Sequence, residues 1–205
     1  MALRHYAAGI SGWGRLQPDR GYDFCGLALD EGEDVLLVDP VAPQPDEFAG
    51  LQALGSKFTI VLLNADHERA SATLARTLGA TVWAPRADLA LLAQPGAQPF
   101  EDGHVFVGGW TAHTVAHLKT PGETVLHHAE SGTLVVGDAL IADPLTGLRL
   151  PPPGKVPDRD AAWRSLRALC DRLEFDAVYF GDGFSLPQGG KAAMLRLLER
   201  EQRAL

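Results

Sequence analysis

Four short runs of consecutive apolar residues stand out in the pattern of hydrophobic and polar positions along the chain. They cover residues 35–38, 58–63, 133–136 and 177–180. Runs of this length without strict alternation are typical of strands that are buried on both faces of a sheet. Residues 22–29 alternate well enough to form a further strand, and an acidic, glycine-containing turn joins them to 35–38 as a hairpin.

The segments between these runs predict helices and shorter strands. Amphipathic spacing predicts helices over residues 46–54, 66–78, 87–92 and 158–173 and from 190 to the end, with Asp66 as the N-cap of the second. Shorter strands are predicted over 81–84, 105–107, 110–118 and 123–128. The first 20 residues predict a short strand followed by a loop that contains Gly9, Gly12, Trp13 and Gly14.

The order of these elements divides the chain into two halves that share a rhythm of strands followed by a helix. A loop rich in proline and glycine begins at Gln94, and we place the boundary between the halves near residues 94–100. Two such halves can pack sheet on sheet with helices outside, or they can form one doubly wound parallel sheet. The pattern alone leaves both folds open.

Each of the four apolar runs delivers a carboxylate close to the point where it ends. The four residues are Asp39, Asp66, Asp138 and Asp182, and the carboxyl ends of strands in open α/β sheets are where ligands bind. Carboxylates that converge repel one another unless a cation or a proton lies between them. Since aspartate often terminates a strand, one such residue would need no further explanation, but four favour a metal site.

Length and charge restrict the class of protein. The 205 residues suit a single domain, and the net charge of −8 without a lysine or arginine cluster argues against nucleic-acid and anionic-membrane partners. No apolar run is long enough to span a bilayer, and the N-terminus lacks a signal-peptide pattern. We therefore expect a cytoplasmic protein in which Cys25 and Cys170 are small buried hydrophobic residues.

Three motifs then carry a resemblance to a known family. Residues 62–67 at the end of the long apolar run, Lys119-Thr120-Pro121-Gly122 and Gly137-Asp138 resemble the H-x-H-x-D-H, H-T-P-G and G-D motifs of the metallo-β-lactamase superfamily in order and spacing. The resemblance covers about residues 36–183. It implies an α+β fold, the αββα sandwich of two mixed sheets with helices outside, as one domain over residues 1–205.

The metal ligands that the resemblance implies are only partly present. Asp66, His67 and Asp138 are retained, whereas Leu62, Asn64 and Lys119 stand where histidines would be, and Asp182 replaces the last histidine. The residues left as ligands suit one divalent ion, Zn, Mn or Fe, but a site without metal is equally consistent with them. These ligands are Asp66, His67, Asp138 and Asp182.

Further roles follow from the same resemblance. We interpret Lys119 as a cation that takes the space of the missing first metal and pairs with Asp138, and Asp66 and Lys119 as the catalytic residues. Asp39 would support the site from below through a hydrogen bond. Asn64, Arg69 and Glu123 would line the pocket. The alternative for Lys119 is a solvated surface lysine, but its place directly before Thr120-Pro121-Gly122 favours the site. Taken alone, Arg69 and Glu123 are better explained as plain surface charges.

Two functions remain open at this point. The first is a metal-dependent hydrolase with a reduced, mononuclear site that acts on a small molecule. The second is a pseudoenzyme that binds a small molecule or a partner without metal. The loops around Trp13 and over residues 145–153 would then select the substrate, and self-association as a homodimer is left open.

Overall fold

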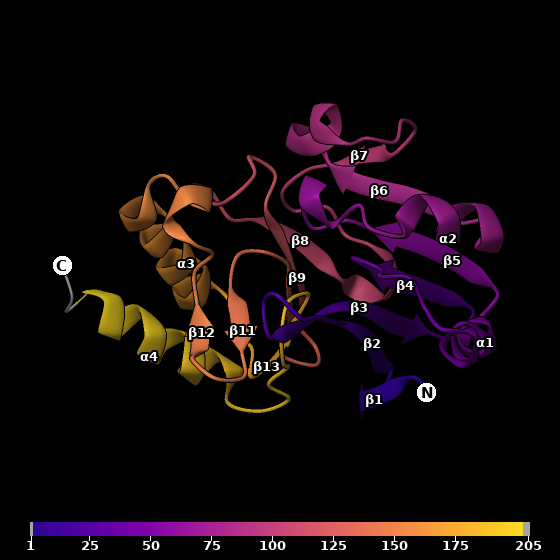
Figure 1. Cartoon of the computed structure of the whole chain (residues 1–205), viewed down its shortest axis with the longest axis horizontal. Helices are drawn as coiled ribbons and strands as arrows, with labels where there is room; N and C mark the ends of the chain where they lie inside the picture. Colours follow the sequence, from indigo (N-terminus) through magenta and orange to yellow (C-terminus); the bar gives the residue numbers. More distant parts are fainter. Residues whose placement is uncertain (1, 203–205) are drawn as a thin grey trace.

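Seven strands form the larger of two mixed sheets in the computed structural model, which describes residues 2–202 (Figure 1). The strands follow chain order across the sheet, antiparallel from β1 to β4 and parallel from β4 to β7. Their bounds are β1 (Arg4–Ala7), β2 (Ile10–Gln17), β3 (Tyr22–Glu31), β4 (Asp34–Val38), β5 (Lys57–Val61), β6 (Thr81–Pro85) and β7 (Gln98–Phe100).

The second sheet has the strand order β13-β10-β9-β8, in which only β10 and β13 run parallel. Its strands are β8 (Thr111–Thr114), β9 (Thr124–His128), β10 (Thr133–Val136) and β13 (Ala177–Phe180). A separate hairpin joins β11 (Ile141–Asp143) to β12 (Gly147–Arg149). β7 lies inside the segment predicted as the boundary between the halves, and it belongs to the first sheet.

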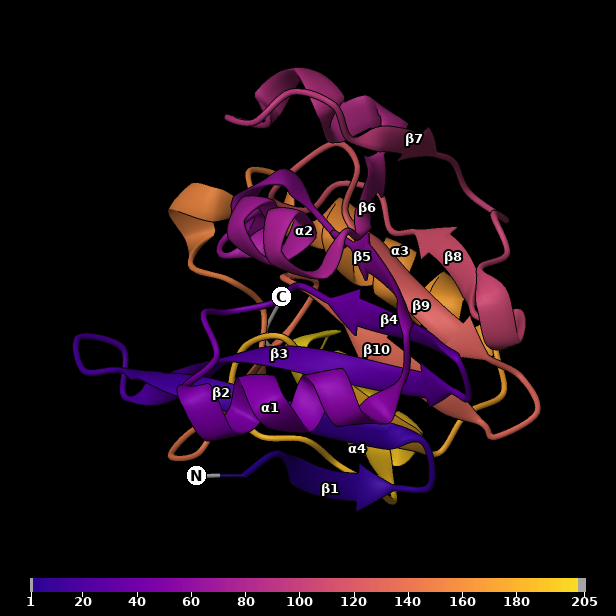
Figure 2. The ribbon, with the colours of Figure 1, turned by 90° about the vertical axis from the view of Figure 1, so that its right-hand side faces the viewer.

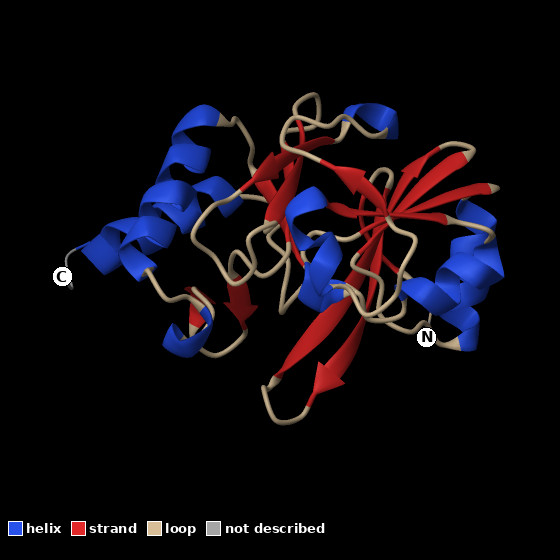
Figure 3. Cartoon of the chain, turned by 90° about the horizontal axis from the view of Figure 1, so that it is seen from above, coloured by secondary structure: helices blue, strands red, loops and turns tan. Residues whose placement is uncertain are grey.

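Helices cover both outer faces of the paired sheets (Figure 3). The first sheet carries α1 (Pro45–Leu54) and α2 (Ser71–Leu78), and the second carries α3 (Arg159–Arg172) and α4 (Gly190–Gln202). Short 3-10 turns span Ala65–His67, Arg86–Leu91, Val107–Gly109 and Pro153–Lys155. The predicted αββα sandwich with two mixed sheets is therefore confirmed. None of the helices in residues 2–202 combines the length and apolarity needed to cross a membrane.

The period of two along the strands builds the layers. Leu36 and Val38 of β4 pack between the sheets, whereas Val35 and Leu37 face α1 and α2. Because successive side chains of a strand point to opposite faces, a strand covered on both sides needs apolar residues throughout. This explains why the central strands appear in the sequence as unbroken apolar runs.

The prediction of a loop after the first strand is wrong, because β2 extends through Gly12, Trp13 and Gly14. A Cβ atom at Gly12 would lie 2.8 Å from the Tyr6 ring, and one at Gly26 on the paired strand would lie 2.6 Å from the Trp13 ring. The missing side chains of these glycines let the aromatic rings lie close to the backbone, and glycine in this role is compatible with a strand. Trp13 is buried, so it does not belong to a substrate loop.

The strand predicted over residues 105–107 and the long strand over 110–118 are also corrected. Gly108 and Gly109 both have positive φ angles, 74° and 85°, which turn the chain before β8. β8 ends at Thr114, and His117 adopts a φ of 63° that no strand accommodates. Positive φ values at these points replace the expected extended backbone with turns.

The helix that was predicted to start at Asp66 starts later. Residues Ala65–His67 form a 3-10 turn, and α2 begins at Ser71 with Ala70 as its N-cap, so Asp66 caps no α-helix. The intervening Arg69 has a φ of 38°, which lies outside the helical region. This break separates the site residues from α2 and gives them their own local conformation.

The two cysteines are free and buried, as predicted. Burial raises the pKa of the Cys25 thiol to about 12 and that of Cys170 to about 11. Since the thiolate is the reactive form, we expect neither residue to react with a disulfide reagent in the folded protein at about pH 8. Both should react once denaturant is added, and fast labelling of the folded protein would contradict this prediction.

Candidate functional site

The ends of two pairs of parallel strands bring the site together. Asp39 directly follows β4, and the turn with His67 follows β5, its parallel neighbour. Asp138 and Asp182 each lie two residues beyond β10 and β13, which are parallel neighbours in the second sheet. The carboxyl ends of both pairs thus meet at one edge of the sandwich, where a ligand site is expected in open sheets.

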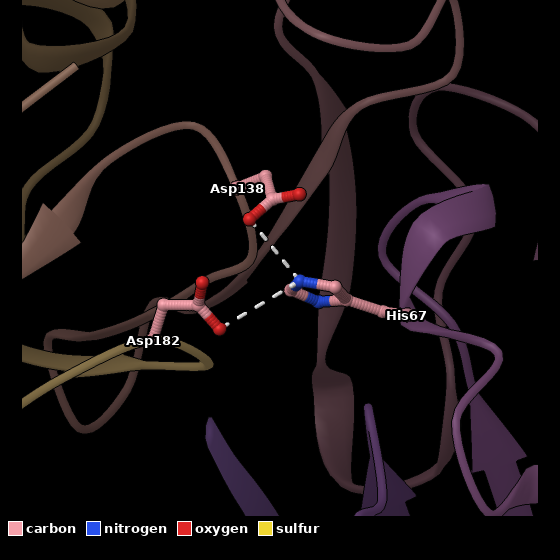
Figure 4. Close-up of side chains that lie close together, drawn as sticks. All are labelled: His67, Asp138 and Asp182. Atoms are coloured by element: carbon pink, nitrogen blue, oxygen red, sulfur yellow. Dashed lines mark ion pairs between the residues drawn. The ribbon is translucent and has the colours of Figure 1, made fainter. Parts of the chain in front are cut away.

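Three buried side chains converge at the centre of this edge (Figure 4). His67 Nε2 lies 3.2 Å from Asp138 Oδ1 and 3.9 Å from Asp182 Oδ1. One ligand atom from each residue lies within 4.8 Å of the others, which is close enough to share a metal ion. The structure therefore brings together His67, Asp138 and Asp182, three of the four predicted ligands.

Asp39 holds His67 from below. Its Oδ2 lies 2.6 Å from His67 Nδ1, and its Oδ1 accepts a hydrogen bond of 2.8 Å from the backbone N–H of Leu63. The backbone of Asp39 has a φ of 48°, a conformation that aspartate tolerates better than most residues. This contact orients the imidazole so that Nε2 faces the two other carboxylates.

Lys119 bridges two carboxylates beside this group. Its Nζ lies 2.5 Å from Asp138 Oδ2 and 2.5 Å from Asp66 Oδ2. Burial lowers the pKa of Lys119, but the adjacent Asp138 and Asp66 carboxylates outweigh burial and raise it. Burial conversely raises the pKa of Asp138, but His67 and Lys119 together hold it well below its usual range.

Asp66 is placed differently from the prediction that it is a metal ligand. Its side chain is 49% exposed, it is paired with Lys119, and it is not part of the group of three within 4.8 Å. No contact among residues 2–202 supports a role as ligand. The structure instead makes Asp66 the outer partner of Lys119.

Arg69 reaches into the centre of the site. Its Nη2 donates to Asp182 Oδ1 at 2.6 Å and lies 2.9 Å from His67 Nε2. Its Nη1 donates to the carbonyl oxygens of Cys25, Gly181 and Asp39 at 3.0, 3.3 and 3.4 Å. These contacts fix the guanidinium between the two sheets, so Arg69 belongs to the centre and also lines the cleft, the position predicted for it.

The proton on His67 follows from the charges around it. Burial and Arg69 lower the pKa of His67, but the Asp39 and Asp138 carboxylates outweigh them and raise it to about 10. These carboxylates favour the protonated imidazole, in which Nε2–H points towards Asp138 Oδ1 at 3.2 Å. The close contact with Arg69 is a hydrogen bond only in the neutral imidazole, in which Nε2 accepts.

These arrangements decide whether a metal ion fits. The Nε2 lone pair of His67 is not free to bind a metal ion in either protonation state. In the protonated ring it carries a proton, and in the neutral ring it accepts a hydrogen bond from Arg69. Asp182 and Asp138 already accept from Arg69 and Lys119. The spacing of the three groups suits an ion, but as the side chains are arranged two cationic residues hold the positions that an ion would need.

Asn64 and Glu123 lie beneath the centre instead of lining the cleft. Both are completely buried, and Asn64 Nδ2 donates to Glu123 Oε1 at 3.3 Å. Asn64 Oδ1 and Glu123 Oε2 make no hydrogen bond within the described part of the chain. Burial, together with the Asp138 charge, raises the pKa of Glu123 well above its ordinary value, so the folded protein favours the protonated carboxyl group. Burial also raises the pKa of Asp182.

Sequence reasoning missed a buried carboxylate that joins two of the motifs. Asp88 accepts hydrogen bonds from the backbone N–H groups of Ala65 at 2.8 Å and Gly122 at 2.7 Å. It therefore ties the turn with His67 to the turn with Lys119. The one signal was an aspartate inside the otherwise apolar run 87–92, because a buried carboxylate must find partners.

The open cleft above the centre has a volume of about 620 Å³. Pro151, Pro152 and Lys155 form one wall, so the end of the predicted 145–153 loop reaches the site, whereas Leu145 is exposed at the hairpin tip. Arg20 lines the cleft from the turn between β2 and β3. Leu62 packs in the layer of α1 and α2 and takes no part in the site.

Comparison with known proteins gives this arrangement a family context. The sequence profile described as "Metallo-beta-lactamase superfamily" matches residues 5–200, which is nearly the whole chain. No functionally curated protein matches the chain.

Several solved structures share the fold. DIM-1 metallo-β-lactamase has a TM-score of 0.77 and 16% identity over 98% of this chain and 99% of its own. FIM-1 metallo-β-lactamase from Pseudomonas aeruginosa, in a mono-zinc form, has a TM-score of 0.73 and 15% identity over 98% and 95%. Rubredoxin oxygen:oxidoreductase from Desulfovibrio gigas has a TM-score of 0.73 and 12% identity over 98% and 61%. Identities this low indicate the fold alone.

Proposed function

Because the chain belongs to the metallo-β-lactamase superfamily, we propose that it retains the cleft of that fold as a binding site for a small anionic molecule and works without a bound metal ion. The observation that carries this proposal is the Arg69 guanidinium, 2.6 Å from Asp182 and 2.9 Å from His67. Lys119 on Asp138 adds a second permanent cation, and together with the protonated His67 these groups balance the buried carboxylates, which otherwise would be costly.

The charge around the cleft supports an anionic ligand. Arg20 and Lys155 line it, and within residues 2–202 neither forms an ion pair. Two exposed cations without a carboxylate partner attract an anion to the mouth of a cleft whose deeper carboxylates are already neutralised. Lys119 lines the same cleft, so it is available to contact a bound carboxylate or phosphate.

The alternative proposal is a hydrolase with one divalent ion, Zn, Mn or Fe. It is supported by the spacing of His67, Asp138 and Asp182 within 4.8 Å and by the orientation that Asp39 gives to the imidazole. It requires the Arg69 side chain to leave the centre. Such an enzyme would act on an ester, amide, thioester, lactone or phosphoryl group.

Metal content distinguishes the two proposals. We expect protein purified without a chelating column, then incubated with zinc, manganese or iron and desalted, to retain far less than one equivalent by plasma mass spectrometry. The Arg69→Gly variant, which removes the guanidinium and tolerates the positive φ, should instead retain about one equivalent of zinc. About one equivalent in the unmodified protein, lost in Asp138→Ala, would overturn the metal-free proposal and favour the hydrolase.

A further inference from the structure

A second, larger cavity lies beside the cleft on the outer side of the first sheet. Its volume is about 860 Å³, within the usual range for small-molecule sites. It lies between the loop after β4, α1 and α2, which neighbour one another on this face (Figure 2). Its walls are mainly apolar and include Phe24, Val41, Pro43, Phe48, Ala70 and Leu74.

The cavity and the cleft share a wall. Phe24 and Arg69 line both spaces, and the Arg69 guanidinium carbon lies 4.7 Å from the centre of the Phe24 ring. The same arginine that contacts His67 and Asp182 therefore borders the apolar space. A molecule in the cleft that extends past this pair would therefore enter the cavity.

The cavity offers no partner for a charged group. Arg15 at its edge forms an ion pair with Glu47 and donates to the carbonyl of Gly14 at 2.5 Å. Nη2 of Arg69 donates to Asp182, and Nη1 donates to backbone carbonyls. Because the walls are apolar and the cations at the edge are already paired, an occupant would gain binding free energy mainly by burying apolar surface. The cavity therefore favours an uncharged, apolar group.

We propose that this cavity holds the apolar tail of the ligand whose anionic head lies in the cleft, so that the ligand is an amphipathic organic anion. This inference rests on the proposed function, which supplies the anionic head. Arg20, Lys119 and Lys155 meet the head, and the Phe24–Arg69 pair marks the junction between head and tail.

The experiment is calorimetric titration of the unmodified protein with straight-chain carboxylates from acetate to octanoate. Each added methylene that enters the cavity should tighten binding by about fourfold, as expected for a buried methylene. Ala42→Trp, which places an indole on an exposed residue of the cavity wall, should remove this dependence on chain length. Thr73→Trp, from α2, serves the same purpose if the first variant fails to fold.

Ala49→Trp is the matched control, because Ala49 is also an exposed alanine but lies outside the cavity wall. It should bind octanoate as the unmodified protein does. Equal affinity along the series, or octanoate binding unaffected by both cavity variants, would overturn the inference about the tail. The absence of saturable octanoate binding would overturn it as well.

Failure of the proposed function has a different signature. Arg20→Gln and Lys155→Gln should weaken the binding of every carboxylate, including acetate, by a similar factor. If chain-length dependence is present and lost in Ala42→Trp while these two variants bind normally, the cavity binds tails but the anion site in the cleft is wrong. If Arg20→Gln and Lys155→Gln weaken carboxylate binding but Ala42→Trp does not change it, the anion site is supported and the proposed tail cavity is overturned.

Discussion

Replacement of Lys119 by methionine is expected to lower the free energy of unfolding by about 3 kcal/mol. The side chain of Lys119 is 19% exposed and that of Asp138 is 5% exposed, so the pair is largely removed from water. Methionine keeps most of the volume but leaves Asp138 buried with one cationic partner fewer. Removal of one partner of a buried ion pair costs more than the pair itself contributes, because an uncompensated charge remains. Urea denaturation at neutral pH measures the change.

Two further variants make this prediction specific. Lys57→Met removes a lysine whose partner Glu33 is 75% exposed, and it should cost less than about 1 kcal/mol. The double variant Lys119→Met with Asp138→Asn removes the stranded charge and should recover much of the loss. A Lys119→Met effect no larger than that of Lys57→Met would contradict the buried bridge.

Replacement of Glu123 by glutamine is expected to stabilise the protein by about 1 kcal/mol or more at about pH 7. Burial and Asp138 raise the pKa of Glu123 in the folded state, whereas in the unfolded chain it lies near 4.3. Above the unfolded pKa the folded state holds a proton that the unfolded state has released. Stability therefore falls as pH rises above about 4.3. Glutamine is neutral at every pH and does not incur this loss.

The pH dependence is the decisive measurement for this second variant. The difference in unfolding free energy between Glu123→Gln and the unmodified protein should be largest near neutral pH and shrink towards about pH 4. Glu130→Gln alters an exposed glutamate and should show no such trend. A stabilisation that stays constant with pH would mean that the Glu123 carboxyl group is ionised in the folded protein.

The main buried strands of the two sheets can be predicted from the pattern of apolar residues. The apolar runs correspond to β4, β5, β10 and β13 because a strand covered on both faces needs apolar residues at every position. The short polar runs that follow these strands place Asp39, His67, Asp138 and Asp182 at one edge of the sandwich, because the carboxyl ends of parallel strands meet there. The resemblance then separated the sandwich from the doubly wound sheet.

Errors in the predicted elements arose where backbone conformation depends on distant neighbours. Gly12 is compatible with a strand because the Tyr6 ring takes the space of its side chain. The turn after β5 is not the start of a helix because Asp88, 23 residues away, binds the N–H of Ala65. Local propensity does not include either contact.

Short-range periodicity in the sequence is enough to identify the buried strands and the acidic residues that meet at their ends. It does not show which groups balance the charges of those acidic residues, because that depends on contacts between distant parts of the chain. Arg69 binds a carbonyl 112 residues further along the chain and a carboxylate 113 residues away, and nothing in its neighbours distinguishes it from a surface arginine. Whether a cation lies at a carboxylate cluster depends on distances of a few ångströms between elements that are remote in sequence, and those distances exist only in the folded protein.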